Sequence, residues 1–382
     1  MNKIYRHTHL KINLDNLIHN VNEIRNFLNK NTTLSAVLKA DAYGHGSIEI
    51  ANALYDNGVN YFLVSTLLEG IELKTYNQNF NVLIMGHTPN EYLNAIVEND
   101  LECTIFTLEQ AKLLNDLSLK HNKTINIHIK IDTGFNRLGI KINSDTLSIV
   151  KEISKLKNLN VIGIFSHLAL KNKESDQKQF DQLNLLISRL ELENISFKYK
   201  HICDSISSVL YPEFQMSMVR IGALIYGLES EERGILNLKQ VLSFHTKLSF
   251  VKKLKKGESI SYGMRWVAKR NSKIGTLPFG YADGYPRNMY QRGFVTINNQ
   301  KAPIVGVICM DQCMIDLTDI KNLNENDNVI IISDGTNNSM SLDEIALLSQ
   351  TNKNEIVSRF TKRVPKIYIK NNKILKIKND LL

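Results

Sequence analysis

Polar side chains of a kind used in catalysis follow short apolar runs in the first part of the chain. Lys39 comes after Ala36, Val37 and Leu38, where a buried strand would leave the core. Lysine can attach a carbonyl cofactor covalently, and arginine is a permanent cation that suits oxygen or ring-nitrogen acceptors. The remaining polar residues after such runs are Lys130, Arg137, His167, Asp204, Ser205 and Arg220.

A second group of residues could bind a phosphate. Tyr43 and Ser205 offer hydroxyl groups, and the turn around Gly222 offers backbone N–H groups. An amine, a phosphate seat and cationic partners together indicate pyridoxal 5′-phosphate (PLP), which acts as an electron sink for amino-acid carbanions. The sequence has no H-E-x-x-H, no cysteine-based zinc pattern and no Walker loop, so we expect no metal.

Eight predicted strands alternate with helical patterns and would position these residues. Such alternation over about 235 residues fits a (β/α)8 barrel of the TIM type, in which chemistry lies at the carboxyl ends of the strands. A doubly wound sheet is the alternative, but no Gly-rich dinucleotide turn follows the first strand. The predicted strands are 34–40, 61–66, 81–86, 102–106, 125–131, 160–166, 198–203 and 217–223.

The pattern changes near residue 237, after which strand-like runs, the first of them 242–251, follow one another with only two intervening helical patterns. We therefore predict a barrel domain over 1–236 and a mostly β domain over 237–382. The first 12 or so residues are predicted to pair with the second domain.

Composition narrows the class of protein. The 382 residues carry a net charge of +9, but the lysines are spread along the chain and no nucleic-acid-binding signature is present. No apolar run reaches the roughly 18 residues that a membrane helix needs, and the N-terminus does not read as a signal peptide. Four scattered cysteines indicate reduced thiols. We expect a cytoplasmic enzyme without a nucleic-acid or membrane partner.

Nine segments in order give the sequence a resemblance to the alanine racemases, which combine a PLP barrel with a β domain. The segments are AVLKADAYGHG, HIKIDTGFNRLG, GIFSH, CDS, VRIGALIYG, SISYG, GYADGYPR, VGVICMDQ and RVPKIY. The resemblance covers essentially the whole chain. It implies interconversion of L- and D-alanine, with D-alanine supplied for peptidoglycan.

The resemblance implies roles for five residues of the reaction centre. Lys39 would carry PLP and act as the base on one face of the substrate, and Tyr262 would act on the other face across a homodimer interface. Arg220 would face the pyridine nitrogen. Arg137 would contact the phenolic oxygen of the cofactor and the substrate. Lys130 matches a position that is carbamylated in many members, where the carbamate orients that arginine.

The same resemblance implies how cofactor and substrate are held. Tyr43, Ser205 and Gly222 would seat the phosphate. Met310 would bind the substrate carboxylate through its backbone N–H. His167 would help to orient the catalytic tyrosine and the network around Arg220.

Four positions depart from the usual family pattern: Asp204 stands for Asn, Asn172 for an acid, Val307 for Arg and Asn354 for Tyr. The last change replaces a phenol that narrows the alanine pocket with a carboxamide that can hydrogen-bond a hydroxyl. Serine racemases of the vancomycin-resistance type show the same change, alongside a membrane domain not found in this sequence. A serine or broad-specificity racemase is therefore an alternative, with Asn354 in contact with substrate, and drift would account for the changes at Asn172 and Val307.

Two other PLP-barrel classes compete with a racemase. Basic-amino-acid decarboxylases share the layout, but SISYG and GYADGYPR favour the racemases. PLP-binding homeostasis proteins have a similar barrel without the second domain, whereas about 145 residues follow the barrel here.

Overall fold

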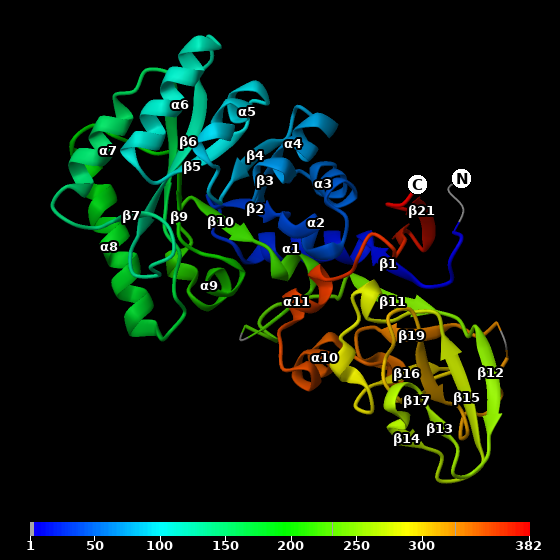
Figure 1. Cartoon of the computed structure of the whole chain (residues 1–382). Coiled ribbons are helices and arrows are strands. Elements are labelled where there is room, and N and C mark those ends of the chain that lie inside the picture. The colour runs from blue at the N-terminus through cyan, green and yellow to red at the C-terminus, as the bar shows by residue number, and fades with distance from the viewer. Residues whose placement is uncertain (1–3, 231, 325) are drawn as a thin grey trace.

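Eight parallel strands form a nearly closed barrel in the computed structural model, which describes residues 4–230, 232–324 and 326–382 (Figure 1). Neighbouring strands follow the order β10-β2-β3-β4-β5-β6-β8-β9, and the N–H of Arg220 donates to the carbonyl of Cys203 over 3.1 Å where the two ends meet. The strands are β2 (Thr33–Val37), β3 (Tyr61–Val64), β4 (Asn81–Ile84), β5 (Glu102–Ile105), β6 (Ile125–Asp132), β8 (Leu159–Phe165), β9 (Tyr199–His201) and β10 (Met218–Ile221), and β7 (Ile140–Lys141) pairs with β6.

Amphipathic helices cover the barrel and bury one apolar face each. In α1 (Leu14–Phe27) the side chains of Leu17, Val21 and Ile24 are buried, and Asn13 caps its first turn. The other helices here are α2 (Lys39–Gly44), α3 (Ser47–Tyr55), α4 (Leu67–Tyr76), α5 (Leu93–Glu98), α6 (Leu108–Lys120), α7 (Thr146–Ser154), α8 (Lys173–Leu192) and α9 (Ser205–Leu210). None of the described helices is both long and apolar enough to span a bilayer.

A ten-stranded sheet organises the second domain, in the order β12-β15-β18-β17-β16-β19-β11-β1-β20-β21. The N-terminal strand β1 (His9–Asn13) pairs with both β11 and β20 of this sheet. The other strands are β11 (Leu242–Thr246), β12 (Phe250–Leu254), β15 (Ser272–Leu277), β16 (Phe294–Ile297), β17 (Gln300–Val305), β18 (Cys313–Asp316), β19 (Val329–Ile332), β20 (Lys366–Lys370) and β21 (Lys373–Lys378), with a separate pair β13 (Ser259–Ile260) and β14 (Trp266–Val267).

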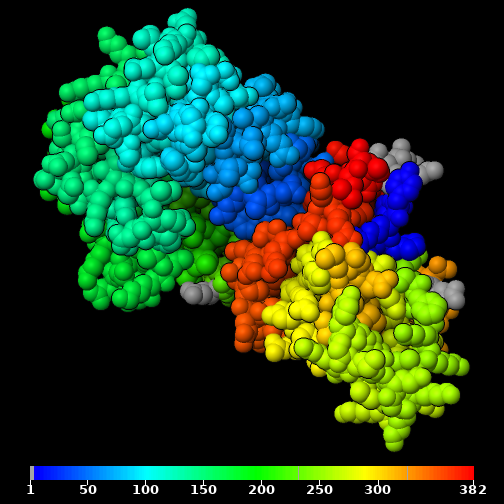
Figure 2. All heavy atoms as spheres, viewed as in Figure 1, coloured from blue at the N-terminus to red at the C-terminus, as the bar shows by residue number. Residues whose placement is uncertain are grey.

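Two helices, α10 (Leu342–Ser349) and α11 (Lys353–Ser358), join the sheet to the barrel. Figure 2 shows this orange and red part of the chain between the two lobes. One hydrophobic cluster continues through both domains, from Leu17 and Ile129 to Ile304 and Ile345. The second domain is therefore packed in a fixed place beside the barrel.

The predicted fold class, a barrel followed by a mostly β domain, is confirmed. Two local predictions were wrong. The first strand ends at Val37 instead of running to residue 40, because the chain turns left-handed after Lys39. The run 242–251 is two strands, since residues 247–249 interrupt it. The boundary at 236/237 stays a prediction, and residues 1–3 of the predicted N-terminal pairing lie outside the described residues.

Candidate active site

A cavity of about 490 Å³ opens at the carboxyl ends of the barrel strands. It gathers most of the residues predicted from sequence: Lys39, Tyr43, Lys130, Arg137, His167, Ser205, Arg220, Gly222 and Asn354. Asp204 also lines it. Tyr262 and Met310 do not line this cavity; they lie in the second domain, where they are 71% and 52% exposed.

Lys39 begins a turn with an unusual backbone. The next four residues, Ala40 to Tyr43, all have φ between +52° and +55°. Left-handed conformation costs about 1–2 kcal/mol for each residue with a Cβ. Such a turn persists only where contacts with surrounding residues hold it. The same contacts place Lys39 at the cavity.

Contacts from distant segments hold this turn. Asp41 forms an ion pair of 2.9 Å with Lys366 of β20 and accepts the N–H of Ser47 over 2.8 Å. The N–H of Ala40 donates to Glu69 Oε1 over 2.7 Å. Backbone packing is also close, because a Cβ at Gly44 would lie 2.0 Å from the Val357 carbonyl oxygen of α11. The turn is thus fixed by the second domain as well as by the barrel.

The amine of Lys39 lies among cations. Burial lowers its pKa below the ordinary value, and the positive charge of Arg137 lowers it further, against a smaller opposing effect of Glu69. A lowered pKa favours the neutral amine, which is the form that attacks a carbonyl or accepts a proton.

The guanidinium of Arg220 is held by four hydrogen bonds among the described residues. It donates to His201 Nδ1 over 2.9 Å, to His167 Nδ1 over 3.1 Å, and to the carbonyls of Ser166 and Ile202 over 3.1 and 2.8 Å. Burial and the neighbouring cations, Arg220 first, lower the pKa of His167 to about 2. His167 is therefore neutral, with Nδ1 accepting from Arg220 and the proton on Nε2.

Lys130 and Arg137 each lie over the ring of a different phenylalanine. The amine of Lys130 is 4.7 Å from the centre of the Phe165 ring, and the guanidinium of Arg137 is 4.4 Å from that of Phe135. Burial, then Arg220 and Arg137, lower the pKa of Lys130 well below its ordinary value. The buried amine of Lys130 therefore favours its neutral form.

Tyr43, Ser205 and Gly222 lie together at one side of the cavity. The N–H of Gly222 donates to Ser205 Oγ over 2.9 Å, and a Cβ at Gly222 would lie only 2.5 Å from the hydroxyl of Tyr43. Burial raises the pKa of Tyr43 to about 12, so this hydroxyl keeps its proton and can donate. The absence of a side chain at Gly222 leaves room for the Tyr43 hydroxyl to lie close to this part of the backbone.

This donor set fits PLP. Lys39 supplies an amine of lowered pKa, the Tyr43–Ser205–Gly222 group supplies phosphate donors, and Arg220 supplies a fixed cation for the ring. A volume of about 490 Å³ lies within the range of small-molecule cavities.

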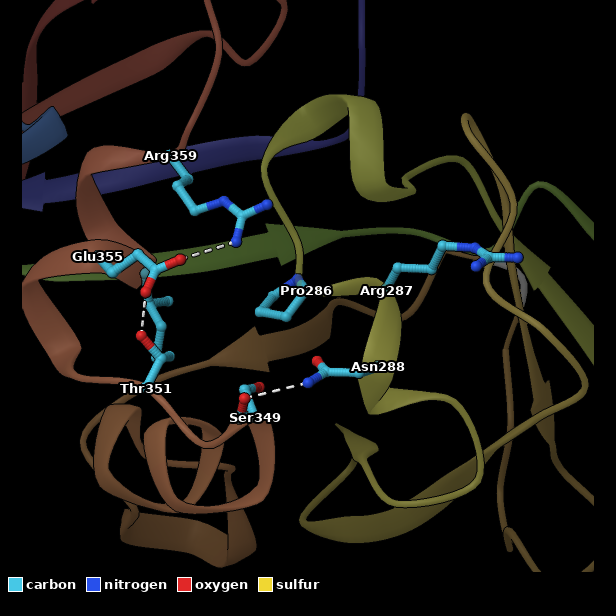
Figure 3. A pocket seen from close by; sticks show the side chains of 8 residues that line it. Pro286, Arg287, Asn288, Ser349, Thr351, Glu355 and Arg359 are labelled. Atoms are coloured by element: carbon cyan, nitrogen blue, oxygen red, sulfur yellow. Dashed lines mark hydrogen bonds and ion pairs between the residues drawn. The ribbon is translucent and has the colours of Figure 1, made fainter.

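A second cavity, of about 260 Å³, lies beside α11 and the turn η6 (Arg287–Met289) (Figure 3). In it Arg359 pairs with Glu355 over 3.0 Å, and the Asn288 side chain donates to the Ser349 carbonyl over 3.0 Å. None of the predicted site residues lines it. The short helix α11 thus turns Asn354 toward the barrel cavity and Glu355 toward this one.

Comparison with known proteins decides the family. Residues 12–230 match the family model described as alanine racemase, N-terminal domain, and residues 241–368 match alanine racemase, C-terminal domain. The chain belongs to the alanine racemase family. Members of this family are PLP-dependent isomerases, in agreement with the donor set of the cavity.

Individual members of the family match nearly the whole chain. An alanine racemase of Clostridium novyi (strain NT) is 38% identical over 376 residues, which is 97% of each chain. The structure of an alanine racemase of Clostridium difficile 630 superposes with a TM-score of 0.95 at 31% identity and covers both chains fully. The alanine racemase of Bacillus anthracis with bound L-Ala-P gives a TM-score of 0.92 at 30% identity, covering 100% of this chain and 99% of that one.

Three of the departures from the family pattern have local partners here. Asp204 caps α9 by accepting the N–H and hydroxyl of Ser207 over 3.0 and 2.8 Å. Asn172 caps α8 by accepting the N–H of Ser175 over 2.9 Å. Val307 is buried, and its carbonyl accepts from Ser261 over 2.8 Å. The first two side chains therefore serve as helix caps.

Sequence reasoning missed several residues that shape the site. Glu69 and Lys366 hold the Lys39 turn, and His201 holds Arg220. A signal existed for His128: it stands two residues before Lys130 on one strand, so both side chains point into the barrel.

Proposed function

We propose that this chain interconverts L- and D-alanine by proton transfer between two bases, Lys39 and the partner subunit's Tyr262. The observation that carries the proposal is the position of Lys39: a half-buried amine of lowered pKa shares one cavity with Arg220 and the phosphate donors. PLP, when bound there, supplies the electron sink that makes the α-carbon of an amino acid acidic.

The protons balance over one turnover. Lys39 Nζ, neutral before reaction, takes the proton from the α-carbon on its own face. The hydroxyl of the second base returns a proton to the opposite face, and the reverse reaction exchanges the two roles. A proton then passes from the Lys39 ammonium group to the tyrosine phenolate, through solvent, and restores both bases for the next turnover. Two bases on opposite faces make it unnecessary for the substrate to turn over in the site.

Arg220 controls the cofactor ring in this proposal. Burial lowers its pKa only to about 10, so the guanidinium stays charged near neutrality and donates hydrogen bonds without giving up a proton. The ring nitrogen facing it would stay unprotonated. A weaker electron sink limits side reactions such as transamination.

A homodimer would complete the site. Tyr262 and Met310 are exposed in the second domain and do not line the cavity of their own chain, as expected for residues that serve another copy. The large apolar side chains of Phe250, Met264 and Val267 are exposed in the same domain. A second chain covering them would bring one tyrosine base and one Met310 N–H, for the substrate carboxylate, to each cavity.

Carbamylation of Lys130 belongs to the same proposal. Carbon dioxide reacts with a neutral amine, and burial beside two arginines favours that form. The resulting carbamate would neutralise part of the charge of Arg137 and Arg220. Protein incubated with ¹³C-bicarbonate should give a carbamate NMR signal that is absent from Lys130→Ala.

We further propose that the enzyme works in the cytoplasm, where it supplies D-alanine for peptidoglycan. Serine is the second candidate substrate. Asn354 lines the cavity where the family usually has tyrosine, so the pocket offers a carboxamide and added volume to a hydroxymethyl group.

Racemisation kinetics on L-alanine and L-serine, measured side by side on the PLP-loaded protein, test the proposal. We expect D-alanine to form faster than D-serine. Borohydride reduction followed by peptide mapping should place the pyridoxyl group on Lys39. Release of carbon dioxide without D-amino acid would favour a decarboxylase and reject the racemase.

A further inference from the structure

A continuous hydrogen-bonded chain crosses the barrel interior from Arg220 to Glu102. Arg220 Nη1 lies 2.9 Å from His201 Nδ1, His201 Nε2 lies 2.9 Å from His128 Nδ1, and His128 Nε2 lies 2.9 Å from the Tyr61 hydroxyl. Tyr61 donates to Glu102 Oε2. The five residues come from five strands, β10, β9, β6, β3 and β5, so the chain spans the barrel from the cavity to its far end.

The chemistry of the groups gives the chain one direction. A guanidinium can only donate, so His201 Nδ1 must accept and its proton lies on Nε2. His128 Nδ1 then accepts, and His128 Nε2 donates to the Tyr61 oxygen. That oxygen is free to accept because the Tyr61 proton points at Glu102. Every proton in the chain therefore points away from Arg220.

The barrel is built around these rings. A Cβ at Gly163 would lie 2.1 Å from His128 Nδ1, so the glycine is what leaves space for the imidazole. Phe165 stacks on His201 with centroids 4.5 Å apart and planes 6° apart, and Tyr199 stacks on His128. The rings are thus fixed on their faces as well as at their nitrogen atoms.

Glu102 lies at the end of the hydrogen-bonded chain that can contact water. It begins β5 and lines a cavity of about 150 Å³, with Lys74 and Asp100, among amino-terminal ends of strands. Its other oxygen accepts from the Asn126 side chain over 3.4 Å. Glu102 is 7% exposed, beside a lysine and a solvent cavity, and it is the acceptor of the Tyr61 hydroxyl at this end of the hydrogen-bonded chain.

Loss of the acceptor at Glu102 would allow the direction of donation along the hydrogen-bonded chain to reverse. The Tyr61 proton could then turn toward His128 Nε2, and each imidazole would move its proton to Nδ1. His201 Nδ1–H would face the N–H group of Arg220, which is a contact between two donors. All four acceptors of Arg220 among the described residues are neutral, so this contact is not offset by a carboxylate bound to the guanidinium.

We propose that Glu102 is a positioning residue for Arg220, acting through Tyr61, His128 and His201 to fix the proton positions that hold the guanidinium toward the cofactor. The proposal deepens the proposed function and rests on it for the role of Arg220. In a merely structural role, the polar groups would only satisfy one another's hydrogen-bonding needs inside the barrel. Such a role predicts no change in the proton position on His201 when Tyr61 or Glu102 is replaced.

Nitrogen NMR of protein with ¹⁵N-labelled histidine separates the two roles, because a bare and a protonated ring nitrogen resonate far apart. The cofactor-free protein is used first, with signals assigned from His128→Asn and His201→Asn. We expect bare Nδ1 and protonated Nε2 at both histidines of the wild type. Glu102→Leu should populate the opposite form of His201, and Tyr61→Phe should do so less, because His128 Nε2 still lies 3.6 Å from Glu102 Oε2. Glu102→Gln, which keeps an acceptor oxygen, should restore much of the wild-type pattern.

A matched control is available at Tyr285. Its hydroxyl is equally buried but has no hydrogen-bond partner among the described residues, so Tyr285→Phe should leave His201 unchanged. In the PLP-loaded protein, Tyr61→Phe and Glu102→Leu should shift the cofactor absorption band and lower kcat for alanine by about tenfold, the scale of a hydrogen bond to a charged group.

The outcomes are distinct. Unchanged His201 nitrogen signals in folded Glu102→Leu would overturn the proposal. If Glu102→Leu does not fold, Glu102→Met decides, because in Tyr61→Phe the Nε2 atom of His128 still lies 3.6 Å from Glu102 Oε2. Failure to bind PLP or to racemise alanine would instead contradict the proposed function, since the histidine signals are read without cofactor.

Discussion

Lys366 and Asp41 form an ion pair of 2.9 Å that joins the last part of the sheet to the turn that follows Lys39. Lys366 is almost fully buried, and it also pairs with Asp380 over 3.1 Å. Tyr368 of the same strand donates to the carbonyl of His45 over 3.0 Å. The left-handed turn that presents Lys39 is therefore held by residues more than 300 positions away in the chain.

Replacing Lys366 tests this restraint. Lys366→Met should lower the free energy of unfolding by about 1–3 kcal/mol, because Asp41 loses its ion-pair partner. The loss is limited because the carboxylate of Asp41 is partly exposed to water. It should also slow the attachment of PLP to Lys39. Thermal melts and the rate of the absorbance change on adding PLP measure both effects. Lys373→Met, an exposed change on the neighbouring strand, is the control, and equal behaviour of the two variants would contradict the restraint.

The pH dependence of PLP attachment reports the surroundings of Lys39. Only the neutral amine attacks, and its fraction rises as pH rises through the pKa. Burial and Arg137 lower this pKa. The pH at which the rate is half-maximal should therefore be lower than the pKa of a free lysine side chain, which is ~10.4. Arg137→Gln removes a like charge and should move the midpoint upward. A midpoint equal to that of Nα-acetyl-lysine, measured in parallel, would contradict the assignment.

Asp204 should weaken the hold on the cofactor phosphate. Its carboxylate lines the cavity next to Ser205 and repels an anion, whereas asparagine would cap α9 equally well. Asp204→Asn should tighten PLP binding about fivefold, corresponding to roughly 1 kcal/mol at a partly solvated site. Equilibrium titration of the cofactor-free protein measures the change. Asp145→Asn at the start of α7, outside the cavity, should have no effect, and weaker binding by Asp204→Asn would reject the argument.

Selectivity should depend on Asn354. Asn354→Tyr should lower the serine-to-alanine ratio of kcat/KM, because the phenol fills the space that a hydroxymethyl group would use. An added small group in a pocket changes selectivity by only ~1–3 kcal/mol, so alanine should remain the better substrate of the wild type. Asn354→Ala, which keeps the space open, should retain serine turnover. Absence of serine turnover in the wild type, or an unchanged ratio in Asn354→Tyr, would assign this departure to drift.

Much of the barrel could be predicted from the sequence because its signals are local. Buried strands such as Tyr61–Val64 and Asn81–Ile84 are short apolar runs, and each is followed by a helix with regular apolar spacing. Parallel strands bring their carboxyl ends to one rim, which is why the amino-acid order is enough to place Lys39, His167 and Arg220 together.

Contacts across the barrel could not be predicted in the same way. Whether His201 meets His128, or Tyr61 meets Glu102, depends on the stagger of strands that are far apart in sequence. The left-handed turn after Lys39 could not be predicted either, because alanine and tyrosine rarely adopt positive φ and four such residues in succession are uncommon. Its cause lies in Lys366 and α11, whose position depends on how the second domain packs.

The shared active site is the central claim, and co-expression of two inactive chains tests it most directly. Lys39→Ala and Tyr262→Phe should each lose nearly all racemisation of alanine, while a hybrid dimer regains one cavity with both bases. Random pairing makes about half of the dimers hybrid, each with one complete site of two, so the mixture should recover about a quarter of wild-type activity. If differently tagged chains show that hybrids form and the mixture is no more active than its components, the two bases do not come from different subunits.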